Sequence, residues 1–278
     1  FLSEQHHCTE QSVVLNITLK ALAQTYRHPS KDPWDAVRLY RIAMTYPDNW
    51  GAQRVATAIN NDSENEFTGI GRSELRAWID GDGMPDAVRA IDHAETHGWT
   101  AEEWTPVTRA LAHLVIGIYV CGSISTETYV PSWSPETAVS EQLLTTALTD
   151  VGCEWTQLTR TTTQQGDECR PTTHGSQLGR ALVVAGAPRG DKTATTVTGL
   201  PGWLETAPAS LKRSLAQFIV RERGIQYQTK ETRQIQTARS QEYFTELAGF
   251  LADVTGEPVT ASTKGVTVSA AAVRQLEL

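Results

Sequence analysis

Apolar residues recur at helical spacing along the first third of the chain, and a mixed pattern of helices and short strands follows it. Between residues 33 and 99, apolar positions three and four apart predict four short helices. Turn residues such as Pro47-Asp48-Asn49 separate them. We therefore expect a compact helical unit over residues 31–103, preceded by an N-terminal extension of residues 1–30 whose sequence carries little structural signal.

Two of these helices have the order of a DNA-reading motif. A helix over 52–59 is followed by a polar interruption and then by a helix over 70–79 that begins with polar and basic residues. This order resembles a helix-turn-helix domain, in which the first residues of the second helix contact base edges. The resemblance implies that Arg72, Ser73 and Arg76 contact DNA. The alternative is a helical bundle with both arginines solvated, and the local charge of 7 - 14 = -7 over residues 31–104 favours it.

From residue 104 to 278 one pattern of helices and strands occurs twice. The first copy predicts a helix over 105–120, strands within 123–133, a helix over 135–151 and a strand from 154 to about 163. The second predicts a helix over 209–220, strands within 225–238, a helix over 240–255 and strands within 259–269. An internal repeat of this size indicates an α+β domain of two similar halves, about 104–170 and 209–278, joined by a linker over 171–208.

The first helix of each half ends in a recognisable sequence motif. The two segments are Leu114-Val-Ile-Gly-Ile-Tyr-Val-Cys-Gly-Ser-Ile124 and Leu215-Ala-Gln-Phe-Ile-Val-Arg-Glu-Arg-Gly-Ile225. Between them stand Gly186-x-Pro-x-Gly-x-Lys192, a Pro-Trp segment and Pro208-x-x-Leu-Lys-Arg213. This succession resembles the LAGLIDADG homing endonucleases. The resemblance implies a pseudo-twofold duplicated αββαββα fold, with the two motif helices side by side and the sheets forming a saddle over the DNA major groove.

The residues expected to cut DNA are missing from both motifs. In that family an acid before each final glycine binds the catalytic metal, and alignment on Gly122 and Gly224 places Cys121 and Arg223 there. Arginine cannot bind a metal ion, and cysteine prefers softer metals than magnesium. The resemblance therefore implies a degenerate scaffold with no catalytic residue, metal or cofactor. Glu222 is one position away, about 100° around the helix, so we expect a solvated helix-end residue; a displaced metal ligand is the alternative.

The strongest basic cluster lies in the second half. Residues 209–239 contain seven basic and two acidic residues, 7 - 2 = +5. Arg221 and Arg223 are candidates for direct phosphate contact, with an exposed cationic helix end as the equal alternative. The strand-like segment that follows is rich in side chains able to hydrogen-bond base edges. Its candidate contacts are Gln226, Gln228, Lys230 and Arg233, and the alternative is an ordinary polar sheet face.

Composition changes this picture in two ways. The chain has a formal net charge of -8, only 6 Lys against 18 Arg, and 36 Thr, a composition that resembles proteins of halophilic archaea. Acidity weakens the electrostatic attraction to DNA, although concentrated salt screens it in any case. No apolar run reaches membrane-spanning length, so we expect a soluble cytoplasmic protein without a membrane partner. The four cysteines lack paired spacing and are expected to be free thiols.

The leading hypothesis is a sequence-specific protein that binds double-stranded DNA on a catalytically inactive homing-endonuclease scaffold, with transcription regulation as its role. One alternative is an active or weakly active metal-dependent DNA endonuclease that uses a ligand such as Glu222. The other is a protein-interaction scaffold, which the acidity favours.

Overall fold

The chain folds into two compact units. The computed structural model of the 278-residue protein describes residues 14–158, 167–227 and 229–278. The helical unit comprises Thr18–Thr96, and the second unit contains His97–Leu278 together with residues 14–17. The first helix packs against two others of the helical unit, so this unit begins at Thr18 and not at residue 31. Residues 1–13 of the expected extension lie outside the described residues.

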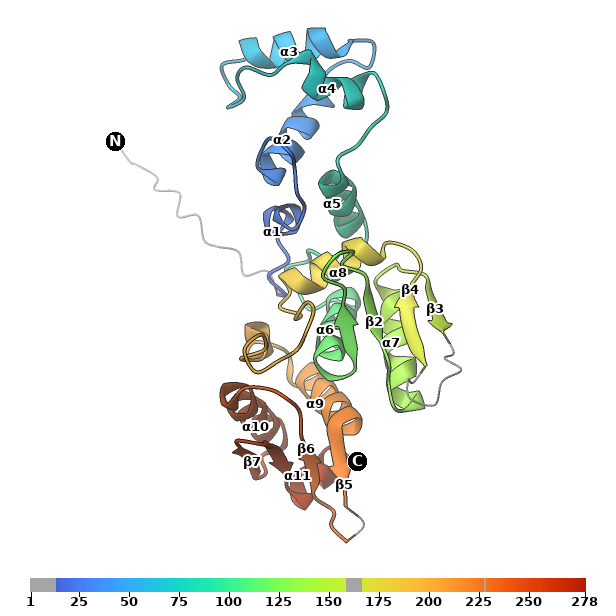
Figure 1. Cartoon of the computed structure of the whole chain (residues 1–278), viewed down its shortest axis with the longest axis vertical. Helices are drawn as coiled ribbons and strands as arrows, with labels where there is room; N and C mark the ends of the chain where they lie inside the picture. Colours follow the sequence, from blue (N-terminus) through green and yellow to red (C-terminus); the bar gives the residue numbers. More distant parts are fainter. Residues whose placement is uncertain (1–13, 159–166, 228) are drawn as a thin grey trace, which may run out of the picture. The chain divides into compact units, whose positions relative to one another are not determined.

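Five helices form the helical unit (Figure 1). Polar caps fix their starts: the Thr18 hydroxyl accepts from Ala21 N at 3.1 Å, and the Asp32 carboxylate accepts from Trp34 N at 2.9 Å. Proline at the first position of the second helix suits the helix start. The helices are α1 (Leu19–Gln24), α2 (Pro33–Ala43), α3 (Ala52–Asn61), α4 (Arg72–Ile79) and α5 (Asp86–Thr96).

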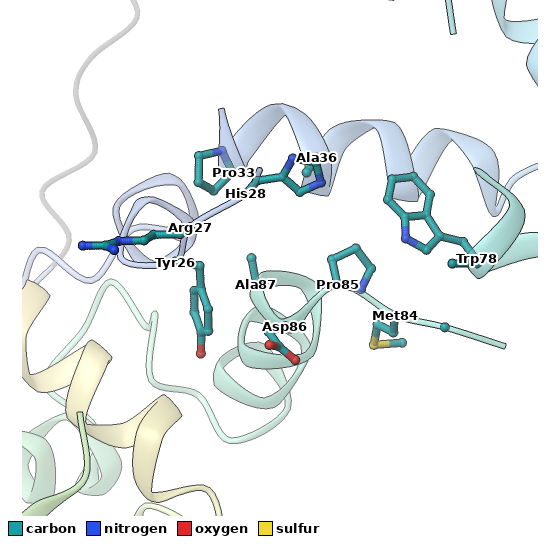
Figure 2. A pocket seen from close by; sticks show the side chains of 12 residues that line it. Tyr26, Arg27, His28, Pro33, Ala36, Trp78, Met84, Pro85, Asp86 and Ala87 are labelled. Carbon is teal, nitrogen blue, oxygen red and sulfur yellow. The ribbon is translucent and has the colours of Figure 1, made fainter. Parts of the chain in front are cut away.

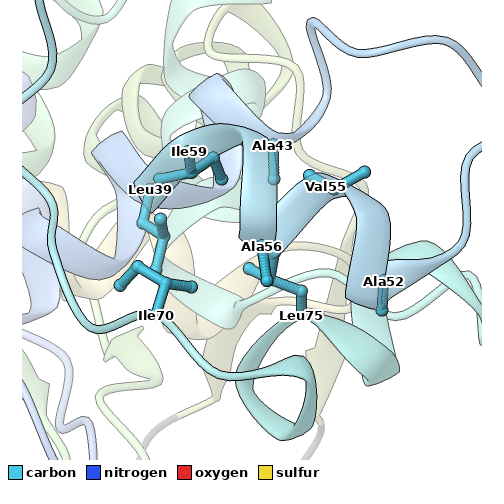
Figure 3. Close-up of a cluster of buried hydrophobic side chains, with 8 residues drawn as sticks. All are labelled: Leu39, Ala43, Ala52, Val55, Ala56, Ile59, Ile70 and Leu75. Atoms are coloured by element: carbon cyan, nitrogen blue, oxygen red, sulfur yellow. The ribbon is translucent and has the colours of Figure 1, made fainter. Parts of the chain in front are cut away.

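The apolar faces of α2, α3 and α4 close on one core. Figure 3 shows the side chains of this core pointing toward one another from the three helices and from the segment before α4. Each is at most 7% exposed. The core residues are Leu39, Ala43, Ala52, Val55, Ala56, Ile59, Ile70 and Leu75.

The polar interruption between α3 and α4 is held by asparagine side chains. Asn60 donates through Nδ2 to the Ile70 carbonyl and accepts through Oδ1 from the Ile70 amide, both at 2.8 Å. Asn65 donates to the carbonyl of Ile59 at 2.8 Å. The bonds of Asn60 satisfy both backbone groups of Ile70, and Asn65 adds a second donor to the Ile59 carbonyl, which also accepts from Asp62 N. The connection is longer than a tight turn, but these bonds fix its path and so the position at which α4 begins.

The second unit repeats one order of elements, helix-strand-strand-helix-strand-strand-helix. The mixed α+β class expected from the sequence is confirmed. The first run consists of α6 (Pro106–Val120), β1 (Gly122–Ile124), β2 (Pro131–Trp133), α7 (Ala138–Asp150), β3 (Trp155–Leu158), β4 (Glu168–Pro171) and α8 (Gly175–Val184). After a short 3-10 turn (Gly202–Leu204), the second consists of α9 (Ala209–Arg223), β5 (Gly224–Gln226), β6 (Arg233–Ile235), α10 (Gln241–Thr255), β7 (Val259–Ser262), β8 (Gly265–Val268) and α11 (Ala270–Gln275).

Each run contains a four-stranded antiparallel sheet of the same topology. The strand orders are β1-β2-β4-β3 and β5-β6-β8-β7. The first hairpins also share a register, since Gly122 pairs with Trp133 and Gly224 pairs with Ile235. Positions of these two first hairpins can therefore be compared one by one at a constant offset.

Helices α6 and α9 pack against each other (Figure 1). Their buried residues include Leu114, Ile118, Leu215 and Ile219, each at most 2% exposed. Polar pairs run along one side of the contact: Arg109 Nη1 donates to Ser210 Oγ at 3.3 Å, and His113 Nε2 lies 2.8 Å from Ser214 Oγ. Burial, and then the charge of Arg109, lower the pKa of His113, so this helix interface contains a neutral imidazole at neutral pH.

A membrane-spanning segment is not found: none of the described helices combines the length and the apolar character that crossing a bilayer requires.

Candidate nucleic-acid interface

Helices α6 and α9 end beside each other and lead directly into β1 and β5. Cys121 caps the end of α6 and is half-buried, whereas Arg223 is the last residue of α9 and is exposed. Burial raises the pKa of the Cys121 thiol far above its ordinary value, and the nearby Glu222 carboxylate raises it further. Since the thiolate is the form that binds metals, Cys121 is a poor ligand here.

Glu222 is not the solvated helix-end residue that the sequence led us to expect. Only 3% of it is exposed. Its Oε2 accepts from the backbone N of Glu136 at 2.9 Å, and its Oε1 accepts from the Thr137 hydroxyl at 3.3 Å. Thr137 is the N-cap of α7, so the carboxylate of the second half lies at the positive end of a first-half helix. The expectation was wrong because α7 covers this side of α9, and local sequence contains no sign of that contact.

Replacement of Glu222 by glutamine is expected to lower the free energy of unfolding by about 1–3 kcal/mol, because a buried charged acceptor at a helix start is lost. Denaturant unfolding measures the loss. Glu127→Gln, on an exposed turn of the same unit, is the control and should change stability little. Equal stability of Glu222→Gln and the parent would contradict a structural role for this carboxylate.

A lysine from the linker lies against the end of α6. Lys192 Nζ donates to the Ile118 carbonyl at 2.7 Å and to the carbonyl of Gly122. The last turn of α6 contains no basic residue of its own, so Lys192 supplies the positive charge that a helix C-terminus favours. Burial first, and then the charges of Arg239 and Arg223, lower the pKa of Lys192 to about 8.

Arg239 brings a third cation to the same place. It precedes α10, and its Nη1 donates to the carbonyl of Lys192 and, at 3.1 Å, to the carbonyl of Ala238. Burial, with a further contribution from Arg223, lowers the pKa of Arg239. We call Lys192, Arg223 and Arg239 the central cation cluster. Within residues 14–158, 167–227 and 229–278, no carboxylate lies within ion-pair distance of any of the three.

Two tyrosines border the central cation cluster. Tyr119 and Tyr243 stack with ring centroids 6.3 Å apart and planes inclined by 4°. The Tyr119 hydroxyl donates to the carbonyl of Gly186 at 2.8 Å. Burial raises the pKa of Tyr243 to about 12, so its ring and hydroxyl remain uncharged beside the arginines at neutral pH.

The open faces of the two sheets are polar but differ in chemistry. Alternation along the paired strands places the row Ser123, Ser132, Arg170 and Thr156 on the side of the first sheet away from its helices. The corresponding row of the second sheet is Ile225, Gln234, Thr267 and Thr260. A hollow of about 590 Å³ lies over the first sheet, lined by hydroxyl groups, by Arg170 and by two acids, Glu168 and Asp191.

The candidate DNA contacts on and beside the second hairpin lie in different environments. Gln226 pairs with Arg233, and Arg233 pairs with the fully buried Val268. Both candidates therefore belong to the row that faces the helices, where Arg233 Nη1 donates to Gly224 O at 3.5 Å. Lys230 is exposed in the connecting turn, and Arg221 is half-buried in the last turn of α9. Gln228 lies outside the described residues.

In the helical unit, the three candidate base contacts share the exposed side of α4. Arg72, Ser73 and Arg76 are all exposed, whereas Leu75 between them is fully buried. Arg72 forms an ion pair with Asp80 at 3.8 Å, along its own helix. Glu74 accepts from Gly71 N at 3.2 Å, which closes the start of α4.

A separate hollow of about 260 Å³ lies elsewhere in the helical unit. Figure 2 shows the residues around it, which come from α2, α4, α5 and the segments before α2 and α5. Tyr26, Trp78 and Met84 give it an apolar wall, and Arg27 and Asp86 are polar residues at its lining. None of Arg72, Ser73 and Arg76 lines it, so it is distinct from the exposed side of α4.

Sequence reasoning missed the position of Lys192. The lysine stands in the quoted Gly-x-Pro-x-Gly-x-Lys segment, but its spacing to the glycines is not that of a phosphate loop. The informative signal was its place after a short apolar helix and a proline, which allows the chain to return across the end of α6. Arg239 was counted within the +5 cluster without any indication of what it contacts.

Comparison with known proteins finds no matching family model and no significantly similar curated protein. Within the described residues, no three His, Cys, Asp or Glu side chains gather as a metal site.

Proposed function

We propose that the chain is a sequence-specific protein that binds double-stranded DNA through a catalytically inactive scaffold resembling the LAGLIDADG homing endonucleases, with regulation of transcription as its role. The second unit spans the duplex with its two sheets, and the exposed side of α4 supplies further base contacts. Cleavage is not part of this function.

The repeated architecture supports the proposal. Two runs of the same seven elements, two sheets of the same strand order and two adjacent helices that lead into their first strands are what the resemblance implies. Antiparallel strands with polar side chains on one face suit the major groove, where those side chains can reach base edges.

The observation that carries the proposal is the central cation cluster. In a chain of net charge -8, three cations that form no ion pair with a described carboxylate gather at the ends of α6 and α9. Like charges close together raise the free energy of the protein unless an anion compensates them. The DNA backbone is such an anion, and contacts between lysine or arginine and phosphate supply most of the sequence-independent affinity.

The residues at the ends of α6 and α9 do not suit nuclease activity. Metal-assisted hydrolysis needs carboxylates that hold divalent ions. Cys121 and Arg223 occupy the two positions at which the resemblance implies metal-binding carboxylates. Both oxygens of Glu222 already accept hydrogen bonds from the start of α7. Positive charges nearby disfavour a divalent cation further.

Selection from a random duplex library with the full chain tests the proposal. We expect enrichment of a defined sequence, bound with higher affinity than unrelated duplex, and no strand cleavage when magnesium or manganese is added. No enrichment, with equal and weak retention of all duplexes at low salt, would favour the protein-interaction scaffold instead. Metal-dependent cutting would favour the endonuclease.

Arg76→Ala is expected to reduce the difference between selected and unrelated duplex by about 1–3 kcal/mol, the contribution of one good base contact. Fluorescence anisotropy at fixed salt measures both affinities. Arg41→Ala is the matched control, since Arg41 is an exposed arginine of the same unit that pairs with Glu95 at 2.7 Å. Equal discrimination in the parent and Arg76→Ala would remove α4 from the proposed interface.

A further inference from the structure

The central cation cluster is built from three separate segments of the second unit. Arg223 comes from the end of α9, Lys192 from the linker, and Arg239 from the segment before α10. Lys192 is fixed by two carbonyls of the α6 end, and Arg239 is fixed by the carbonyl of Lys192. Lys192 and Arg239 are therefore held in place by these bonds, and the end of α9 places Arg223 near both of them.

The cluster is left with capacity to bind an anion. An ammonium group has three N–H donors, and the two bonds to Ile118 and Gly122 use two of them. Arg223 is exposed, and the described residues show no hydrogen bond from its guanidinium group. Both side chains can turn donors toward one anion, which would also relieve the repulsion among the three charges.

We propose that the central cation cluster binds one phosphate group of the duplex DNA backbone directly, with no metal ion between protein and phosphate. This inference rests on the proposed DNA-binding function. The guanidinium group of Arg223 suits two phosphate oxygens, and Lys192 acts as a point charge on the same group. Arg239 contributes charge and holds Lys192 in place.

The first test measures duplex affinity in EDTA as a function of salt concentration. Arg223→Ala is expected to weaken binding and to reduce the slope of log affinity against log salt by about one, the signature of one lost phosphate contact. Lys212→Ala is the control. Lys212 lies in the first turn of α9, roughly 16 Å from Arg223 along the helix, and its charge is paired with Asp253 at 3.6 Å. Equal slopes for the parent and Arg223→Ala would overturn the proposal.

The second test uses pH. Three groups face Lys192: Arg223 from α9, Arg239 before α10, and the thiol of Cys121 at the end of α6. The pKa of Lys192 is about 8 without an anion, so above that pH a phosphate must bind together with a proton. Affinity should then fall as pH rises from 8, by up to about tenfold per pH unit. The Cys121 thiol does not titrate between pH 7 and 9, because burial raises its pKa far above the ordinary value of a thiol.

Lys192→Arg provides the comparison, since a guanidinium group remains charged throughout this range. We expect this variant to bind duplex with an affinity that is flat between pH 7 and 9. Thermal unfolding of each variant confirms that it is folded. A parent with the same flat profile, or a Lys192→Arg variant with an unchanged fall, would contradict the role of Lys192.

Inorganic pyrophosphate separates this inference from the proposed function. One outcome is that the selected duplex binds, but Arg223→Ala does not change the salt slope and Lys192→Arg does not change the pH profile. DNA binding then stands, and the proposed phosphate contact at this cluster is wrong. If no duplex binds, but pyrophosphate raises the Tm of the parent and not of Arg223→Ala, the cluster binds a free phosphate compound. That outcome overturns DNA as the source of the phosphate.

Discussion

Replacing Trp133 by alanine is expected to lower the free energy of unfolding of the second unit by about 3–5 kcal/mol. Trp133 is 1% exposed, and its Nε1 donates to the carbonyl of Leu114 at 3.3 Å. A Cβ atom on Gly117 would approach its ring nitrogen to 2.7 Å, so the ring fills the space between β2 and α6. Its removal leaves a cavity that neither rigid element can close.

Trp155→Ala is the matched control for this prediction. Trp155 is also in the first sheet, but 38% of it is exposed, so the loss of stability should be clearly smaller. Denaturant unfolding, followed by circular dichroism, gives both values. Equal losses in the two variants would show that Trp133 is not a central packing residue. A loss confined to the helical unit would contradict the division of the chain into two units.

Leu75→Ala is expected to destabilise the helical unit by about 2–5 kcal/mol and, as a consequence, to remove discrimination between DNA sequences. Leu75 is fully buried on α4, among the core residues of Figure 3. Because α4 depends on that core for its position, loosening it would disorder Arg72, Ser73 and Arg76 together. Hydrogen exchange should show lost protection in α3 and α4, with the helices of the second unit unchanged.

The neighbouring substitution Arg76→Ala separates packing from contact. Arg76 is exposed, so its loss should change DNA discrimination without changing hydrogen exchange. If Leu75→Ala lowers protection but discrimination survives, the helical unit is not needed for sequence recognition. If neither variant changes discrimination, the helix-turn-helix resemblance carries no functional meaning.

Strong periodicity let the sequence predict most helices. The run from Leu114 to Val120 is apolar on every side, and α6 is buried almost all round. Proline and glycine marked the breaks, and the caps Thr105 and Ser240 stand at helix starts. These signals are local, so they do not depend on what each helix packs against.

The site could not be predicted in the same way, because it depends on contacts between distant segments. The period of two along a strand does not say which face is covered, and the pairing of Arg233 with Val268 decided it. The burial of Glu222 follows from the approach of α7, which begins about eighty residues earlier in the chain. Lys192 reaches α6 through the linker, whose path no periodic pattern specifies.

The contact made by Glu222 also means that the two halves are not interchangeable. By the shared strand register, the first-half position equivalent to Glu222 is Val120, which is 1% exposed and has no acceptor to offer. The bond from α9 to the start of α7 therefore has no equivalent between α6 and the start of α10. A homodimer assembled from two first halves would leave both copies of α7 without the carboxylate at their starts. The single chain thus pairs two unlike parts, despite their common topology.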